Sequence, residues 1–369
     1  MSRCSPVVNS ARAARQAALV ERLVSQHLDG VLVTSLPNIR YLTGFSGSNA
    51  LLLVTARETH LVTDFRYQTQ AAEESGDVCR VRIETSSLWS GLWSLLATIP
   101  GAQALGFESA HLLHRDFQRL LEQGDRPHWR PVTDLVEGLR AQKDAGEVAY
   151  IRAAGAMAMK ALRVTLESVR VGMTELEVCG ILERALREAG SDAHPFPPIV
   201  ASGPRSALPH ARASTRTIAP GEFLLLDFGA STGGYCSDVT RTVVLGHVDE
   251  RQRETYDAVR EANRVAREGI RAGMPGRDGD ALARGVLESR GFGGLFGHGL
   301  GHGIGLEVHE APRLSRLAEE VLPVGSVVTI EPGVYVPEWG GVRIEDDVYL
   351  GADGAELLTD FTRELLVLS

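Results

Sequence analysis

Residues Gly221–Gly246 read GEFLLLDFGASTGGYCSDVTRTVVLG, and residues Gly325–Leu350 read GSVVTIEPGVYVPEWGGVRIEDDVYL. In both stretches an acidic residue lies six positions after the opening glycine and ends an apolar run of strand length. A second acid lies four positions after a Gly-Gly pair. Both stretches are typical of strand, turn and strand, and both follow a pair of predicted helices. The spacing therefore predicts a duplicated unit that brings together Asp227, Asp238, Glu331 and Glu345.

Four acids at the ends of buried strands need positively charged partners, because burying an unpaired carboxylate is very costly in free energy. Arg241 and Arg343 are near enough in sequence to pair with them. Arginine pairing explains one acid readily, but it explains four acids at matched positions less well than a metal site does. Oxygen ligands favour manganese, magnesium or calcium, and an added imidazole shifts the preference towards manganese, cobalt or zinc.

The histidine-rich stretch Gly294–Pro312 reads GLFGHGLGHGIGLEVHEAP. It fits a phosphate loop poorly, because no lysine follows the glycines and no ribose-binding acid is evident downstream. His298 and His302 have the spacing of a zinc helix, but the catalytic glutamate of that motif is absent and the glycines disfavour a helix. We therefore expect a tight strand or loop that directs imidazoles into a cleft.

The rest of the chain is typical of a globular enzyme of two domains. It has 369 residues, 44% hydrophobic residues and a formal net charge of −9, which argues against nucleic acid and anionic membrane as partners. Four scattered cysteines predict no disulfide framework. The sequence shows neither a secretory signal nor a membrane span, so we expect a cytoplasmic protein. Alternating helices and strands predict an α/β domain over residues 1–138, followed by a second domain over residues 139–369.

The motifs DFG, GYCSDVTRT, GHGLGHGIGLEVHE, TIEPGVY and GVRIEDDV resemble those of the pita-bread dimetal peptidases. This family includes methionine aminopeptidase, aminopeptidase P, prolidase and the metal-free creatinase. The resemblance implies an α/β creatinase-like N-terminal domain, a mixed sheet with helices, and an α+β pita-bread catalytic domain with pseudo-twofold symmetry. It also implies two divalent metal ions, manganese by preference or else zinc or cobalt. Their implied ligands are Asp227, Asp238, His302, Glu331 and Glu345.

The same resemblance implies a role for each ligand and for the residues around them. Asp238 and Glu345 would bridge the two metals, Asp227 would complete one of them, and His302 and Glu331 would complete the other. Glu331 would also shuttle the proton, and His309 would stabilise the tetrahedral intermediate. His298 would line the cleft, and His210 would contact the substrate near the scissile bond. Arg343 and Tyr335 would lie beside the metals and contact the substrate. Alternatively, Arg343 could simply neutralise Glu345 or Asp346, and Tyr335 could simply pack.

The stretches SLPNIRYLTGFSGSNALLLVT and LVTDFRYQTQA resemble the N-terminal domain of bacterial Xaa-Pro peptidases. In that family the domain mediates dimerisation and partly covers the cleft, so the resemblance implies a homodimer. It predicts an Xaa-Pro aminopeptidase acting on peptides with proline at the second position. A prolidase, which cleaves Xaa-Pro dipeptides, is the alternative within the enzyme class. A non-catalytic pita-bread binding protein is the alternative from another class.

Overall fold

The computed structural model describes residues 6–122 and 127–369 of the chain, which forms two compact units, Met1–Arg140 and Ala141–Ser369. Within the described ranges, no helix is both long enough and apolar enough to cross a lipid bilayer. Cys79 and Cys179 are free thiols, and Cys4 lies outside the described residues.

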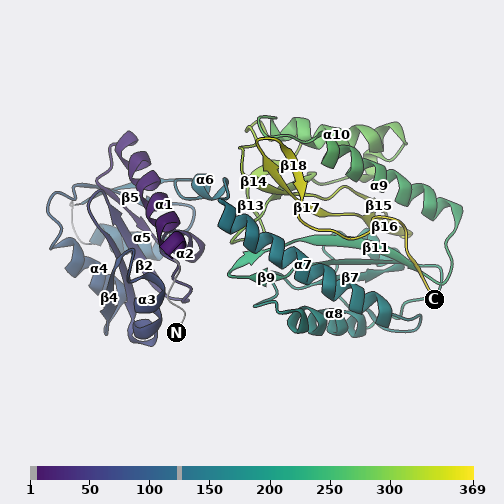
Figure 1. Cartoon of the computed structure of the whole chain (residues 1–369), viewed down its shortest axis with the longest axis horizontal. Helices are drawn as coiled ribbons and strands as arrows, with labels where there is room; N and C mark the ends of the chain where they lie inside the picture. The colour runs from purple at the N-terminus through teal and green to yellow at the C-terminus, as the bar shows by residue number, and fades with distance from the viewer. Residues whose placement is uncertain (1–5, 123–126) are drawn as a thin grey trace. The chain divides into compact units, whose positions relative to one another are not determined.

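The first unit is built on a mixed six-stranded sheet in the order β4-β3-β2-β1-β5-β6 (Figure 1). Strands β1, β2 and β3 pair antiparallel, whereas β1–β5, β5–β6 and β3–β4 pair parallel. The strands are β1 (Gly30–Val33), β2 (Ala50–Thr55), β3 (Thr59–Asp64), β4 (Arg80–Glu84), β5 (Ala104–Glu108) and β6 (His128–Val132). The helices are α1 (Pro6–Ser25), α2 (Leu36–Thr43), η1 (Phe65–Tyr67), α3 (Gln68–Ser75), α4 (Leu88–Leu96), α5 (His114–Glu122) and α6 (Glu137–Arg140).

The second unit contains the duplication, which extends into the helices. Asp144 caps α7 and Asp249 caps α9, each in a reciprocal capping box with the residue three positions later, Glu147 or Gln252. Each of these helices is followed by a shorter one, so each half begins with a helix pair. The helices are α7 (Ala145–Ser168), α8 (Glu175–Ala189), η2 (Gly203–Ala207), α9 (Glu250–Gly269), α10 (Gly276–Ser289) and η3 (Gly293–Leu295).

Each duplicated stretch forms four strands, so the predicted strand–turn–strand pattern was too simple. The outer strands β8 and β11 pair antiparallel around the inner pair β9–β10, and β14 and β17 pair in the same way around β15–β16. The strands of the first half are β7 (Ile199–Ser202), β8 (Phe223–Phe228), β9 (Ser231–Thr232), β10 (Tyr235–Cys236) and β11 (Val239–Leu245). Those of the second half are β12 (Gly301–Gly303), β13 (Glu310–Leu314), β14 (Ser326–Ile330), β15 (Gly333–Val336), β16 (Gly340–Arg343), β17 (Asp346–Gly351) and β18 (Gly354–Leu357). The last strand, β19 (Val367–Leu368), pairs in parallel with β11 of the first half.

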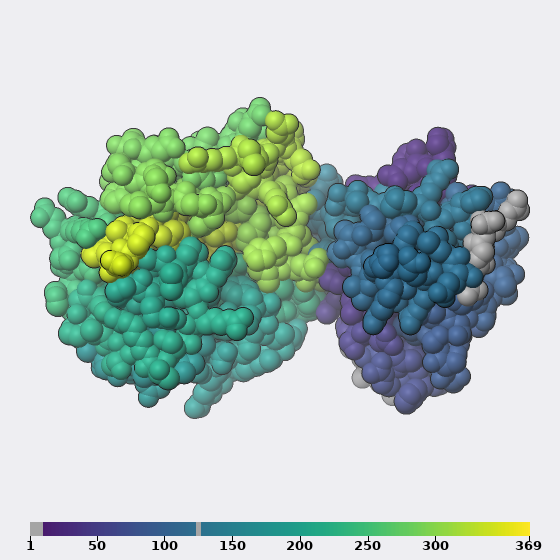
Figure 2. Space-filling view, turned by 180° about the vertical axis from the view of Figure 1, so that it is seen from behind, coloured from purple at the N-terminus to yellow at the C-terminus, as the bar shows by residue number. Residues whose placement is uncertain are grey.

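The two halves of the second unit lie against each other, with α7 and α8 on one side of the strands and α9 and α10 on the other (Figure 1). Figure 2 shows them as a teal lobe and a green-to-yellow lobe. The unit has two buried apolar clusters: one runs from Ala154 to Leu245 in the first half, and the other combines residues of the second half, as far as Leu350, with Phe223 and Val244 of the first. Backbone and side-chain hydrogen bonds join the halves at Thr240 and Thr242, which bond to Glu345 and Arg343.

Four of the six glycines in the histidine-rich stretch are explained by the crowding around β12. A Cβ on Gly299, Gly301 or Gly303 would lie 2.6, 2.0 or 2.1 Å from a carbonyl oxygen of a neighbouring segment. A Cβ on Gly305 would lie 2.0 Å from a carboxylate oxygen of Glu310. Every second residue of this segment therefore lacks a side chain, and His298 and His302 are among the residues that alternate with these glycines. The predicted tight strand is confirmed, with β12 paired to both β13 and β14.

This crowding predicts opposite effects for two glycine-to-alanine changes. In G301A the new methyl group would meet the carbonyl of Thr329, so we expect a loss of about 1–3 kcal/mol in the free energy of unfolding. In G285A, within α10, a Cβ meets nothing within 4 Å, so we expect a gain of about 0.5–1 kcal/mol. Urea denaturation of the full chain measures both. Equal free energies of unfolding for the two variants would contradict the explanation.

Candidate metal centre

The five predicted metal ligands come together where the strands of the two halves end. Asp227 lies in β8, His302 lies in β12, and each of the others lies directly before or after a strand. The His302 Nε2 atom is 3.4 Å from Glu331 Oε1 and 3.9 Å from Asp238 Oδ2. Ligand atoms of Asp238, His302 and Glu345 all lie within 4.8 Å of one another. This arrangement is close enough for one cation to contact all three.

The carboxylates of this cluster lack the partners that buried anions need. Asp227 Oδ1 and Asp238 Oδ1 are buried without a hydrogen-bond partner among the described residues. Burial, followed by the charge of Glu345, raises the pKa of both Asp238 and Glu331 well above the ordinary range. Burial, followed by the charge of Asp227, raises the pKa of Glu345 to about 8. Divalent cations would supply the missing positive charge and accept these oxygen atoms, so the residues present fit a metal site.

His302 is prepared to act as a neutral nitrogen ligand. Burial lowers its pKa to about 4, so the ring is uncharged near neutral pH. Its Nδ1 lies 3.0 Å from the carbonyl oxygen of Gly303, which can only accept a hydrogen bond. The proton of the neutral ring is therefore on Nδ1, and the lone pair of Nε2 points towards Glu331 and Asp238. The hydrogen bond from Nδ1 to Gly303 therefore fixes the ring in the tautomer that binds metal.

His298 differs from His302 because both of its ring nitrogens have protein partners. Its Nδ1 donates to the carbonyl of Gly299 at 2.8 Å, and its Nε2 lies 2.8 Å from the hydroxyl of Tyr335. Arg343 Nη1 in turn donates to that hydroxyl at 2.8 Å, and Arg343 Nη2 makes an ion pair with Asp227. A continuous chain of hydrogen bonds thus runs from His298 to Asp227.

This chain of hydrogen bonds gives Arg343 and Tyr335 specific partners. Arg343 pairs with Asp227, rather than with Glu345 or Asp346, and the Tyr335 hydroxyl makes specific hydrogen bonds. Asp346 is held instead by Arg241 and Arg363, each at 2.8 Å. Burial alone would raise the pKa of Asp346, but these two arginines outweigh it and lower the pKa to about 2. Asp346 is therefore a structural anion that is fully paired.

The two remaining predicted site residues lie on the exposed side of the cluster. The ring of His309 meets that of His302 edge to face, with 4.4 Å between centroids and 75° between planes. His210 is exposed in the loop after η2, where its charge acts on Asp227 and on His298. Both imidazoles are therefore close to the ligands while remaining open to solvent.

Three residues around the ligands were not predicted from the sequence. Thr240 Oγ1 donates to Glu345 Oε2 at 2.6 Å and accepts from Arg343 Nε at 3.0 Å. Thr329 Oγ1 accepts from the backbone N–H of His302 at 3.1 Å. The carboxylate of Asp347 accepts from the backbone N–H of Asp238 at 3.1 Å. The two threonines lie two positions from a ligand, so the strand period could have placed them on the ligand face.

Comparisons with known proteins match most of the chain. The model of metallopeptidase family M24 matches residues 149–352, and that of the creatinase/prolidase N-terminal domain matches residues 15–142. An Xaa-Pro dipeptidase of Pyrococcus horikoshii is 36% identical over 350 residues, which cover 94% of this chain and 97% of that protein. The structure of an Xaa-Pro dipeptidase from Bacillus anthracis matches with a TM-score of 0.93 at 37% identity, covering 97% of this chain and 100% of the other. An X-Pro aminopeptidase structure from Thermotoga maritima matches with a TM-score of 0.89 at 34% identity, covering 96% and 99%. These matches confirm the family and the fold class predicted from the sequence.

The raised pKa of Glu345 predicts how the stability of the metal-free protein depends on pH. Its pKa of about 8 lies above its ordinary value of 4.5, so the folded chain binds this proton more tightly than the unfolded chain. The contribution to stability is fully present below pH 4.5 and is lost as the pH rises through 8. We expect the free energy of unfolding of EDTA-treated wild type to fall over this window more steeply than that of E345Q.

Urea denaturation at a series of pH values measures the two slopes. Added Mn²⁺ should remove the difference for wild type, because the cation replaces the proton as the partner of the carboxylate. Parallel curves for metal-free wild type and E345Q would show that Glu345 titrates normally.

Proposed function

Because this chain belongs to metallopeptidase family M24, we propose that it is a metal-dependent exopeptidase that hydrolyses Xaa-Pro bonds, with Xaa-Pro dipeptides as its preferred substrates. The observation that supports metal-dependent hydrolysis is the cluster of buried acids with unpartnered oxygens beside the neutral His302. The dipeptide preference is supported by the two relatives named Xaa-Pro dipeptidase. The Thermotoga maritima relative favours a second candidate, the X-Pro aminopeptidase predicted from the sequence.

We propose that two divalent cations are held by the five predicted ligands, Asp227, Asp238, His302, Glu331 and Glu345. When bound, the cations would lower the pKa of water and polarise the scissile carbonyl. The mixture of carboxylates with one imidazole supports manganese, with zinc or cobalt as alternatives. Asp238 and Glu345 would both help to hold the cations, one from each duplicated half.

The residues around the ligands would bind the peptide and move its proton. Glu331 would accept a proton from the attacking water and donate it to the proline nitrogen, which is the leaving group. His309, exposed beside His302, would donate a hydrogen bond to the developing oxyanion. His210 would contact the substrate near the scissile bond. His298 and Tyr335 would act mainly by orienting Arg343, and thereby Asp227, through the hydrogen-bond chain.

We further propose that residues 1–138 form the dimerisation domain and that the active protein is a homodimer. The match of residues 15–142 to the creatinase/prolidase N-terminal domain supports this proposal. With every predicted ligand position filled, a purely non-catalytic binding protein is the weaker alternative.

A matched pair of substrates separates the two exopeptidase candidates. Leu-Pro carries a free carboxylate on proline, whereas Leu-Pro-amide has the same shape without that charge. A dipeptidase has to recognise the carboxylate, so we expect kcat/KM with Mn²⁺ to be at least about 100-fold lower for the amide, the size of a lost charge-assisted contact. The tripeptide Leu-Pro-Ala should be cleaved as slowly as the amide. Equal rates on all three substrates would establish the aminopeptidase instead, and no cleavage of any would refute the proposed function.

The proposed role of Glu331 is tested by E331Q. Removing the proton acceptor should lower kcat by about 10²- to 10⁴-fold. E356Q is the matched control, since the Glu356 side chain is 53% exposed and pairs with Arg152. Steady-state kinetics at saturating Mn²⁺, together with metal analysis of each variant, gives the result. Wild-type turnover in E331Q would exclude Glu331 from proton transfer.

A further inference from the structure

Asn263 lies within α9 and is fully buried, and its side chain bonds both to the end of β14 and to the segment between β16 and β17. Its Nδ2 donates to the carbonyl of Ile330 and to the carbonyl of Ile344, each at 3.1 Å. These carbonyls belong to the residues directly before Glu331 and Glu345. One amide group therefore fixes the main chain beside two of the five proposed metal ligands.

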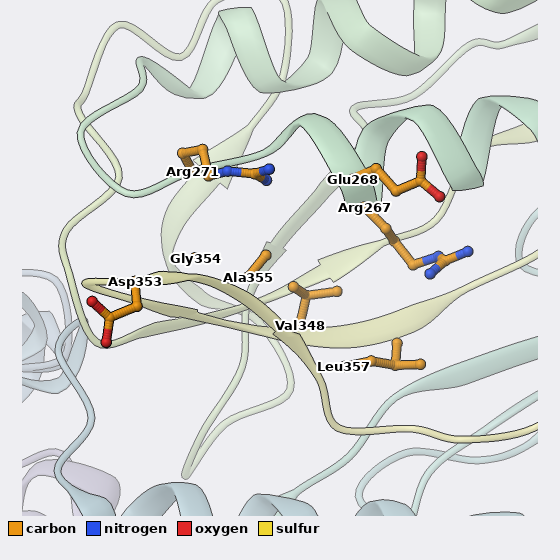
Figure 3. A pocket seen from close by; sticks show the side chains of 8 residues that line it. All are labelled: Arg267, Glu268, Arg271, Val348, Asp353, Gly354, Ala355 and Leu357. Atoms are coloured by element: carbon orange, nitrogen blue, oxygen red, sulfur yellow. The ribbon is translucent and has the colours of Figure 1, made fainter.

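The orientation of the Asn263 amide is fixed from its other side by Arg267. Arg267 Nε donates to Asn263 Oδ1 at 2.6 Å, so both hydrogens of Nδ2 are directed to the two carbonyls. The guanidinium of Arg267 also lies 3.7 Å from Asp346, the residue after Glu345. On its outer side Arg267 lines a surface pocket of about 470 Å³ with Glu268 and Arg271 (Figure 3). The arginine thus orients the amide from the edge of the domain.

The first half of the duplication has no counterpart to this pair. The N-caps Asp144 and Asp249 bring α7 and α9 into register, and fourteen residues after each cap lie Ala158 and Asn263. Likewise Leu162 corresponds to Arg267. Ala158 and Leu162 are fully buried apolar residues, so helix packing at these positions does not require polar groups. The amide is present only where the helix meets Ile330 and Ile344.

We propose that Asn263 is a positioning residue for metal binding: it holds Glu331 and Glu345 at the separation that the cations require, and Arg267 holds Asn263. This inference rests on the proposed function, which identifies the two glutamates as ligands. Groups that orient metal ligands typically contribute about 10- to 100-fold to metal affinity. Asn263 touches no ligand side chain and acts through the main chain on which both ligands are carried.

The experiment is the affinity of the full chain for Mn²⁺, measured by titration calorimetry after EDTA treatment and without any peptide. We expect N263A to bind Mn²⁺ about 10- to 100-fold more weakly than wild type. N263D keeps an acceptor for Arg267 while removing both donors, so it should lose affinity similarly and gives a second test if N263A folds poorly. R267M should show a smaller loss in the same direction.

Q252A is the matched control, because Gln252 is also a buried amide of α9. It donates to the carbonyl of Gly221 at 2.8 Å, away from any proposed ligand. Thermal unfolding of metal-free protein should show that Q252A and N263A are both destabilised, whereas only N263A and N263D lose affinity for Mn²⁺. Kinetics at saturating Mn²⁺ should then recover most of the turnover of N263A.

Two results would overturn the inference: unchanged Mn²⁺ affinity in both N263A and N263D, or an equal loss of affinity in Q252A. Neither depends on which peptides the enzyme cleaves. A wild type that binds Mn²⁺ and cleaves no Xaa-Pro peptide would overturn the proposed function and leave the positioning role intact.

Discussion

The structure of the second unit depends on the electrostatic cost of burying carboxylates side by side. Within residues 6–122 and 127–369, no arginine or lysine makes an ion pair with Asp238, Glu331 or Glu345. Burial and the charge of Glu345 raise the pKa of Asp238 and of Glu331, and burial and the charge of Asp227 raise that of Glu345, so the cluster favours the binding of protons or cations. These carboxylates are kept in place by two helix pairs, by two nested sets of strands and by the glycine-rich strand β12.

The duplication supplies the two pairs of acids, and the differences between the halves make the site asymmetric. Each half contributes one acid at the end of a buried strand and one before the returning strand. Only the second half adds His302, on a strand so crowded that its neighbours are glycines. The same half has Asn263 where the first has Ala158. The departures from symmetry therefore lie at the ligands, where an asymmetric substrate needs asymmetric surroundings.

The features that could be predicted from the sequence are those whose interacting residues lie close together along the chain. The four acids, the duplication and the strand bearing His302 are local patterns with fixed spacing, so they were predictable. The inner strand pairs were not, because they depend on turns such as Gly233–Gly234, whose glycines have φ of 58° and 84°. The pairing of Arg343 with Asp227 spans 116 residues, and Asn263 bonds to residues 67 and 81 positions away. Such contacts exist only once the halves have packed together.

The hydrogen bonds of Arg343 also limit how a substrate carboxylate can be recognised. Its Nε, Nη1 and Nη2 bond to Thr240, Tyr335 and Asp227, and its side chain is only 4% exposed. Nη1 also donates to the carbonyl of Pro209 at 3.5 Å, so four of the five N–H groups are engaged and no pair is left for a bidentate carboxylate. Among the predicted site residues, His210 and His309 are exposed and can donate to such a group. A preference for dipeptides would therefore depend on imidazole donors.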